Sequence, residues 1–302
     1  MDVKAKRLNA AFVEMTKTAQ EAETVREMTQ TFLREKIRED SFFRMILPPR
    51  IVTRAECTRS VNHRSLVKII DIEPDVPAAV PVDFRGNTEA VYVTGERYEV
   101  PFMEIMSREF QMKQYELLSY EMPITEILRE NTEKEIAKAE DKGFMNAVEA
   151  ALAVTGHVVT RTKEAGQTVD KKDLAALFKI HDSVQLKTSI VLIPLPLYED
   201  ILAWDFSLLG NELIKEVTIG GYNYPTLMGR TVIVTNKLDI VSPNTIYGFT
   251  TQEYLGHSFL LEEDLVFDMV KEFDLYRFKA WELIGAGIGN VKAVSKLVLT
   301  NA

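Results

Sequence analysis

The sequence has 302 residues, of which 46% are hydrophobic, so it is long enough to bury one large core or two modest ones. Its formal net charge of −9 argues against a protein that works by gripping nucleic acid, because phosphate binding needs clustered Lys and Arg. The single cysteine, Cys57, excludes an intramolecular disulfide, and stability must therefore come from burial and packing.

We expect neither a signal peptide at the N-terminus nor a membrane span. The first ten residues, MDVKAKRLNA, are charged and lack the apolar segment of a signal peptide. No stretch approaches the roughly 18 unbroken apolar residues of a membrane span. We therefore expect a soluble protein that is made in the cytoplasm and has no membrane partner.

Residues 4 to about 46 are predicted to form one long charged helix, because no glycine or proline precedes Pro48. Apolar side chains recur there in steps of three and four, which places them on one stripe of a helix. The stripe consists of Leu8, Phe12, Met15, Ala19, Ala22, Val25, Met28 and Phe32. Two interpretations have equal weight: an amphipathic helix on its own domain, or an arm that docks on a neighbouring subunit.

The next segment has the pattern of a long hairpin. The first predicted strand is 66–72, with Val67 and Ile69 on one face, and the second runs through Ala90 to Val93 and includes Val91. Three prolines and a turn-like Arg-Gly-Asn lie between the strands. An isolated two-stranded hairpin is marginal in water, so this one needs a surface, on the same chain or on another copy.

A second long helix is predicted from Ile124 to Leu152, with Pro123 at a position that tolerates a missing N–H. Its length would be roughly 40 Å at about 1.5 Å per residue. Gly143 is expected to mark a bend. The apolar positions at helical spacing are Ile127, Leu128, Ile136, Phe144, Met145 and Val148.

The remaining chain alternates helices with strands and then becomes mostly strand-like. We expect helices at 170–180 and 197–204 and a turn at Gly220, Gly221 and Asn223. The predicted strands are 189–193, 231–234, 245–249, 265–267, 276–284 and 294–299.

No catalytic or metal-binding constellation is readable. His63, His157, His181 and His257 are scattered without metal-type spacing. The glycine-rich run 285–289 lacks the Lys-Ser/Thr of a nucleotide loop, which favours a flexible turn.

The acidic clusters are expected to be exposed charge, since neighbouring positions point different ways. These clusters are Glu140 and Asp141, and Glu262 to Asp264. Cys57 has Arg54 and Arg59 nearby but no activating histidine in sequence, so a reactive thiol is only a minor alternative.

Three stretches resemble the major capsid proteins of tailed bacteriophages, whose fold is shared with the herpesvirus capsid floor and with bacterial encapsulin shells. They are MPITEILRENTEKEIAKAEDKGF, SIVLIPLPLYEDILAWD, and TLMGRTVIVTNKL followed by NTIYGF. They are similar, in order, to the long spine helix of the family, to the strand and short helix of its axial domain, and to the return into its peripheral domain.

The resemblance implies an α+β phage major capsid protein fold. Its parts would be an N-terminal helical arm (1–50), an extended hairpin loop (51–104), a peripheral domain with the spine helix (105–153 and 246–302) and an axial domain (154–245). Some family members cross-link a hairpin lysine to an asparagine of a neighbour. One lysine, Lys68, and one asparagine, Asn290, make no such constellation here.

The function that the resemblance implies is self-assembly, as pentamers and hexamers, into the icosahedral head shell of the virion. Such a shell encloses phage DNA without sequence-specific binding, and scaffold, portal and cement proteins are candidate partners. We expect no catalysis and neither a cofactor nor a metal. The candidate contacts between subunits are Leu8, Phe12, Met15, Val25, Phe32, Val67, Ile69, Val91 and Val93.

Two alternatives stay open at this point. The same fold could build an encapsulin-like compartment that houses an enzyme instead of a genome. A chain of a different class, an α+β enzyme with no readable site, would reveal itself by a pocket with converging titratable groups.

Overall fold

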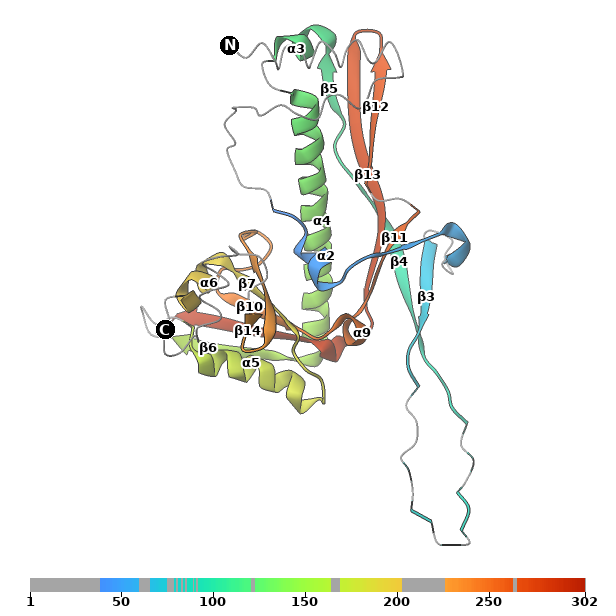
Figure 1. The fold of residues 1–302 in the computed structure, drawn as a ribbon, viewed down its shortest axis with the longest axis vertical. Helices are drawn as coiled ribbons and strands as arrows, with labels where there is room; N and C mark the ends of the chain where they lie inside the picture. Colours follow the sequence, from blue (N-terminus) through green and yellow to red (C-terminus); the bar gives the residue numbers. More distant parts are fainter. Residues whose placement is uncertain are drawn as a thin grey trace.

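In the residues that it describes, the computed structural model shows an α+β fold built on two β-sheets and one long helix, with a hairpin that projects away from the body (Figure 1). It describes residues 39–59, 66–74, 79, 81–82, 84, 86–88, 90, 92–120, 123–163, 169–202, 226–262 and 265–301. The predicted helix up to residue 38, the turn at Gly220, Gly221 and Asn223, and His63 lie outside these residues.

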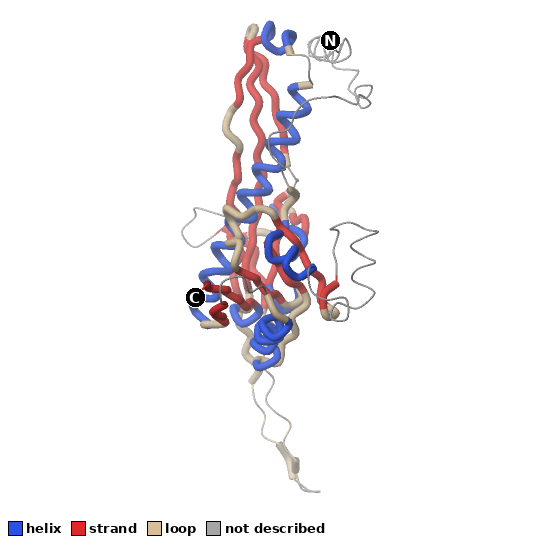
Figure 2. Tube along the Cα trace, turned by 90° about the vertical axis from the view of Figure 1, so that its left-hand side faces the viewer, coloured by secondary structure: helices blue, strands red, loops and turns tan. Residues whose placement is uncertain are grey.

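The larger sheet has eight strands arranged around β13, in the order β1-β11-β13-β4-β3-β2, with β12 and β5 also paired to β13. Its strands are β1 (Arg50–Val52), β2 (Thr58–Arg59), β3 (Leu66–Asp71), β4 (Arg97–Met106), β5 (Phe110–Lys113), β11 (Gly256–Leu261), β12 (Val266–Glu272) and β13 (Leu275–Ile288). Strands β4, β5, β11 and β12 all run antiparallel to β13. The distal parts of β12, β13 and β5 extend beside the long helix (Figures 1 and 2).

The smaller sheet has six strands in the order β6-β14-β10-β7-β9-β8. They are β6 (Val158–Lys163), β7 (Ile190–Pro194), β8 (Thr226–Leu227), β9 (Arg230–Thr235), β10 (Thr245–Phe249) and β14 (Val294–Asn301). The central strand β10 is buried along its whole length, which explains why its sequence has no polar alternation. The strands predicted at 189–193, 231–234, 245–249, 276–284 and 294–299 are confirmed, and the one at 265–267 belongs to the longer β12.

Two helices accompany the smaller sheet, α5 (Lys171–Ser183) and α6 (Leu195–Leu202). Asp173 accepts a hydrogen bond from the backbone N–H of Asp170 at 2.9 Å, which satisfies a donor at the start of α5. The sheet joins strands from 154–245 to strands β10 and β14 of the later stretch 246–302. The predicted domain boundaries stay a prediction.

The long helix α4 (Ile124–Thr155) confirms the second predicted helix and follows the N-cap Pro123. It ends at Gly156, whose φ of 67° is left-handed and whose N–H donates to the Leu152 carbonyl at 2.8 Å. The helix continues through Gly143, where a bend was expected. Its inner face packs through Phe144, whose ring lies 5.0 Å from Phe43 and 5.8 Å from Phe249.

Only a short helix, α2 (Phe42–Ile46), is present in the described part of the predicted N-terminal helix. Residues 39–41 are not helical, because Ser41 is the N-cap and accepts from the Arg44 N–H at 3.3 Å. The prediction of one continuous helix through residue 46 was therefore wrong at residues 39–41. The other short helices are η1 (Arg54–Glu56), α3 (Gln114–Ser119), α9 (Gln252–Leu255) and η2 (Val291–Ala293).

The hairpin is present, but its second strand is not where the sequence placed it. Strand β3 pairs with β4, from Val67 opposite Pro101 to Asp71 opposite Arg97. In the stretch 90–93, the described residues are not in a strand. Position 72 makes one further backbone bond, from its N–H to the Glu96 carbonyl at 2.8 Å. Pairing with β3 therefore selects 97–101 rather than the earlier apolar run.

The glycine-rich run 285–289 is not a flexible turn, because β13 continues through Ile288. Strand β4 passes so close to this part of the chain that a Cβ at Gly285, Gly287 or Gly289 would lie within 3.0 Å of one of its atoms. The glycines here allow the strands to approach each other closely, and the chain does not reverse its direction.

Candidate assembly site

A buried carboxylate in the middle of α4 binds both the first described segment and a lysine after β9. Asp141 on α4 is 0% exposed, and its Oδ2 accepts from Lys237 Nζ at 2.6 Å. Its Oδ1 accepts from Ser41 Oγ at 2.8 Å and from the Phe43 N–H at 2.9 Å. Burial raises the pKa of the Asp141 carboxyl, and Lys237 opposes that rise. One carboxylate thus holds three separate stretches of the chain.

Next to it, Arg44 lies between two buried carboxylates. Its Nε donates to Glu140 Oε2 at 2.9 Å and its Nη2 to Glu140 Oε1 at 2.6 Å, which is a bidentate geometry. The same Nη2 donates to Glu282 Oε2 of β13 at 2.8 Å. Both glutamate side chains are fully buried, whereas the Arg44 side chain is 29% exposed.

We call these six side chains the charge cluster: Ser41, Arg44, Glu140, Asp141, Lys237 and Glu282. The expectation that Glu140 and Asp141 are exposed was wrong. Their positions on the inner face of α4 bring them against partners that are distant in sequence. The cluster fixes residues 41–44 to α4, to β13 and to the loop after β9, and so anchors the chain immediately after the predicted arm.

Backbone and apolar contacts strengthen this anchor. Glu39 accepts from Thr235 Oγ1 at 3.0 Å and from the Asn236 N–H at 2.9 Å. Phe42 and Phe43 are 2% and 1% exposed and belong to the main core with α4 and β10. The segment 39–47 is thus part of the body.

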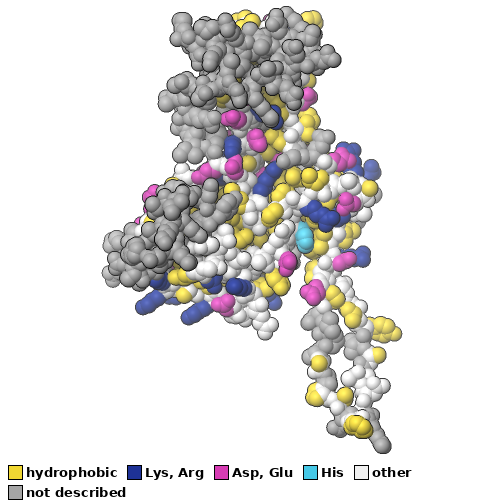
Figure 3. Space-filling model, viewed as in Figure 1, with side chains coloured by type: hydrophobic (Ala, Val, Ile, Leu, Met, Phe, Trp, Pro, Cys, Tyr) yellow, Lys and Arg dark blue, Asp and Glu magenta, His cyan; other side chains and the backbone are white. Residues whose placement is uncertain are grey.

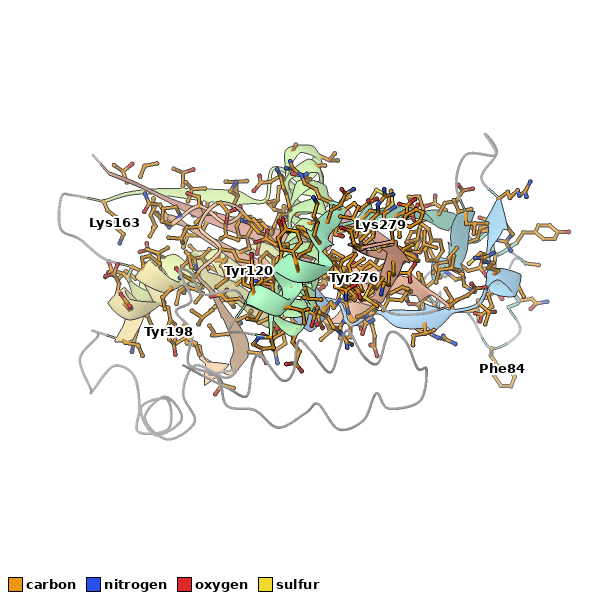
Figure 4. The ribbon with its side chains drawn as sticks, turned by 90° about the horizontal axis from the view of Figure 1, so that it is seen from above. Phe84, Tyr120, Lys163, Tyr198, Tyr276 and Lys279 are labelled. Atoms are coloured by element: carbon orange, nitrogen blue, oxygen red, sulfur yellow. The ribbon has the colours of Figure 1, made fainter. Side chains whose placement is uncertain are left out.

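The hairpin, in contrast, carries large apolar side chains in solvent. Phe84 is 101% exposed and Tyr92 is 96% exposed, and Val82 and Val93 are also exposed. Figure 3 shows hydrophobic side chains along the hairpin, and Figure 4 shows Phe84 projecting away from the body. Exposed apolar surface of this kind is typical of a binding site for another protein.

The predicted contact residues divide into three groups. Ile69 is 39% exposed and Val93 is 59% exposed, so both are free to meet a neighbour. Val67 is 3% exposed and packs within its own chain, which leaves little side-chain surface for that role. The others lie outside the described residues: Leu8, Phe12, Met15, Val25, Phe32 and Val91.

An apolar cavity of about 460 Å³ lies between α4 and the strands β4 and β5. Its walls include Ile105, Met106 and Phe110 on the strand side and Leu128 and Ile136 on the helix. Its polar lining residues include no histidine, no cysteine and no pair of carboxylates, which are the groups typical of a catalytic site; they are Ser107, Arg108, Asn131, Thr132 and Glu135.

The histidines stand apart from the charge cluster. His181 is buried, and its Nδ1 lies 2.8 Å from Thr188 Oγ1. Burial, with a contribution from His157, lowers the pKa of His181 to about 4. His257 lies 2.5 Å from Tyr98, and its pKa is lowered by burial. Across the described ranges, no group of three or more His, Cys, Asp or Glu side chains could hold a metal ion.

Cys57 is half-buried beside η1, and burial raises the pKa of its thiol. A raised pKa disfavours the thiolate, which is the reactive form. Glu262 forms an exposed ion pair with Arg54 at 3.1 Å, while its neighbours 263 and 264 lie outside the described residues. No described helix is long and apolar enough to cross a membrane.

Comparison with known proteins finds similarity in structure but not in sequence. No protein-family model matches the chain, and no curated protein matches it. A solved chain of Mycobacterium phage Bobi superposes with a TM-score of 0.64 at 10% identity, over 93% of this chain and 97% of that chain.

Two solved capsids are also similar. The capsid of Cyanophage P-SCSP1u gives a TM-score of 0.60 at 11% identity, covering 91% of this chain and 93% of that chain. The capsid of an empty GTA (gene transfer agent) particle gives 0.58 at 13% identity, covering 97% and 99%. The protein therefore has the fold of tailed-phage and gene transfer agent capsid chains, as the α+β capsid fold expected from the sequence implied.

Proposed function

We propose that this chain is the major capsid protein of a tailed phage or a related particle, and that it assembles with itself into an icosahedral shell of pentamers and hexamers. The observation that carries the proposal is a body with its own buried core that presents a long hairpin with solvent-exposed Phe84 and Tyr92. Because isolated hairpins are marginal in water, a neighbouring copy is the surface that this hairpin needs.

The wider features of the proposal follow from the same fold. The parts would be the arm (1–50), the hairpin loop (51–104), the peripheral domain (105–153 and 246–302) and the axial domain (154–245). The role is structural rather than catalytic. Scaffold, portal and cement proteins are the candidate partners, and the shell, made in the host cytoplasm and present in the virion, would enclose DNA without sequence-specific contacts.

The encapsulin-like alternative has less support, because the similar structures named above are capsids or phage chains. An α+β enzyme is also less supported, since the cavity between α4 and the strands β4 and β5 has Arg108 and Glu135 as its titratable lining residues, without a histidine, a cysteine or a second carboxylate.

The test is assembly of the purified full chain, followed by sedimentation velocity and negative-stain electron microscopy at increasing concentration. We expect closed shells. The double variant Phe84→Ser/Tyr92→Ser should assemble only at a concentration at least about tenfold higher, because burial of one such ring contributes about 1.5–3 kcal/mol.

The control is Val154→Ser, which removes a 77% exposed apolar side chain at the end of α4. It should leave the assembly concentration nearly unchanged. The shell proposal would be contradicted if the full chain stays monomeric at every concentration and salt condition, and also with scaffold protein added. If the double variant assembles normally, Phe84 and Tyr92 do not contribute to the contacts between subunits.

A further inference from the structure

The root of the hairpin is a point where β4 exchanges one partner strand for another. Residues 97–101 of β4 pair with β3, whereas 102–106 pair with β13. Strand β11 pairs with residues 284–288 on the opposite edge of β13. Backbone bonds from β4 to β13 therefore do not extend to the half of β4 that belongs to the hairpin.

Side chains replace those bonds at the root. Gly285 and Gly287 of β13 and Gly289, one residue beyond its end, occupy alternate positions, so they share one face. A Cβ at Gly287 would lie 2.9 Å from Val100 Cγ2, and one at Gly289 would lie 3.0 Å from Tyr98 Cζ. We call this face the glycine track. The side chains of β4 rest directly on its backbone.

One hydrogen bond fixes Tyr98 on the glycine track. Its hydroxyl lies 2.5 Å from His257 Nδ1 of β11, and the His257 ring is stacked on Phe259 at 6.0 Å between centroids. Burial raises the pKa of Tyr98 to about 12 and lowers that of His257. A protonated phenol facing a neutral imidazole favours donation from the Tyr98 O–H to Nδ1.

We propose that Tyr98, seated on Gly287 and Gly289 and hydrogen-bonded to His257, sets the direction in which the hairpin leaves the sheet. The hairpin extends far from the body, so a small rotation at its root displaces the tip by a large distance (Figure 1). This role belongs to the single chain and does not depend on shell assembly.

The experiment measures that direction as a distance within one chain. Nitroxide labels are attached at Ile69→Cys on β3 and Val154→Cys on α4, in a chain that also carries Cys57→Ser. Both sites are exposed. Labelled chain is diluted into excess unlabelled chain, so that pulsed electron spin resonance reports only distances within a subunit, assembled or not.

Tyr98→Phe removes only the hydroxyl and is expected to increase the population of displaced hairpins about fivefold, the loss of one net hydrogen bond. Gly289→Ala should shift the main distance, because its methyl group meets the Tyr98 ring. Gly95→Ala is the matched control within the hairpin, since its Cβ would meet only the Ile72 carbonyl oxygen, at 3.8 Å.

Unchanged distance distributions in both Tyr98→Phe and Gly289→Ala, with native circular dichroism, would overturn the proposal. If Gly289→Ala does not fold, Tyr98→Phe alone decides. A control Gly95→Ala that shifts the distance as much as Gly289→Ala would also count against it, because the effect would then not be specific to the glycine track.

Discussion

Replacing Lys237 by Met should strongly destabilise the folded chain. Methionine retains most of the aliphatic stem but removes the ammonium group that donates to Asp141 at 2.6 Å and to the Asp40 carbonyl at 2.7 Å. The Asp141 carboxylate stays fully buried, with Ser41 Oγ and the Phe43 N–H as its remaining donors. A buried charge then lacks its counterion.

The size of the effect follows from burial. Asp141 is 0% exposed and Lys237 is 9% exposed, so solvent screens the pair very little. Removing one partner of a buried pair costs about 3–5 kcal/mol in the free energy of unfolding. For a chain of this size, that corresponds to a decrease of roughly 5–8 °C in the melting temperature.

The assay is thermal and urea unfolding of unassembled chain, followed by far-ultraviolet circular dichroism. Lys134→Met is the matched control, because Lys134 lies on α4, as Asp141 does, and pairs with Asp40, whose carbonyl Lys237 also contacts. That pair is partly exposed, so its loss should cost less than about 1 kcal/mol. A Lys237→Met variant as stable as Lys134→Met would refute the argument.

The pH dependence adds an independent check. Burial already raises the pKa of Asp141, and loss of Lys237 should raise it further. A carboxyl group whose pKa is higher in the folded state than in the unfolded state stabilises the fold when protonated. The stability deficit of Lys237→Met should therefore be largest above the folded-state pKa of Asp141, and should shrink as the pH falls through it toward 3.8.

Three further outcomes are expected. His181 has its pKa lowered from 6.5 to about 4, so the chain should lose about 3 kcal/mol of stability as the pH falls across that interval, and urea titrations of His181→Gln should lack this loss. Arg44→Met deprives Glu140 and Glu282 of their shared guanidinium and should cost at least about 3 kcal/mol in the same unfolding assay. Cys57 should react with a disulfide reagent at pH 7 more slowly in the native chain than in urea, because burial raises its pKa; equal rates would contradict this.

Elements set by a local period could be predicted from the sequence. The helical spacing of Ile136, Phe144 and Val148 predicted α4, and all three side chains are buried. The short apolar runs 189–193 and 245–249 likewise predicted the strands β7 and β10. Burial imposes these patterns on neighbouring residues, so a window of ten to twenty residues contains the signal.

The charge cluster could not be predicted in this way. Asp141 and Lys237 are 96 positions apart, and Arg44 and Glu282 are 238 positions apart. An acidic pair on a helix has the same local appearance whether solvent or a distant cation faces it. The tertiary contact determines its burial, and no feature of the adjacent sequence specifies that contact.

The predictions for the second hairpin strand and for the glycine-rich run 285–289 were wrong for a related reason. The apolar residues around Val91 have good strand propensity, yet strand pairing depends on which residues can lie opposite β3. Glycine at 285, 287 and 289 favours a turn in isolation. In the fold, the same residues lie under Tyr98 and Val100, where any side chain would collide.

Two attachment points in the described residues, which we call roots, follow one principle: side-chain contacts within the chain hold each of them to the body. The segment after the predicted arm is held by the charge cluster, and the hairpin by Tyr98 and His257 on the glycine track. Substitutions at the roots should therefore change the stability or geometry of the single chain. Substitutions at exposed positions such as Phe84 should change assembly alone, because no intramolecular burial is lost there. A root variant that leaves the single chain intact but abolishes assembly would break this division, and a neighbouring copy would then have to contact the root itself.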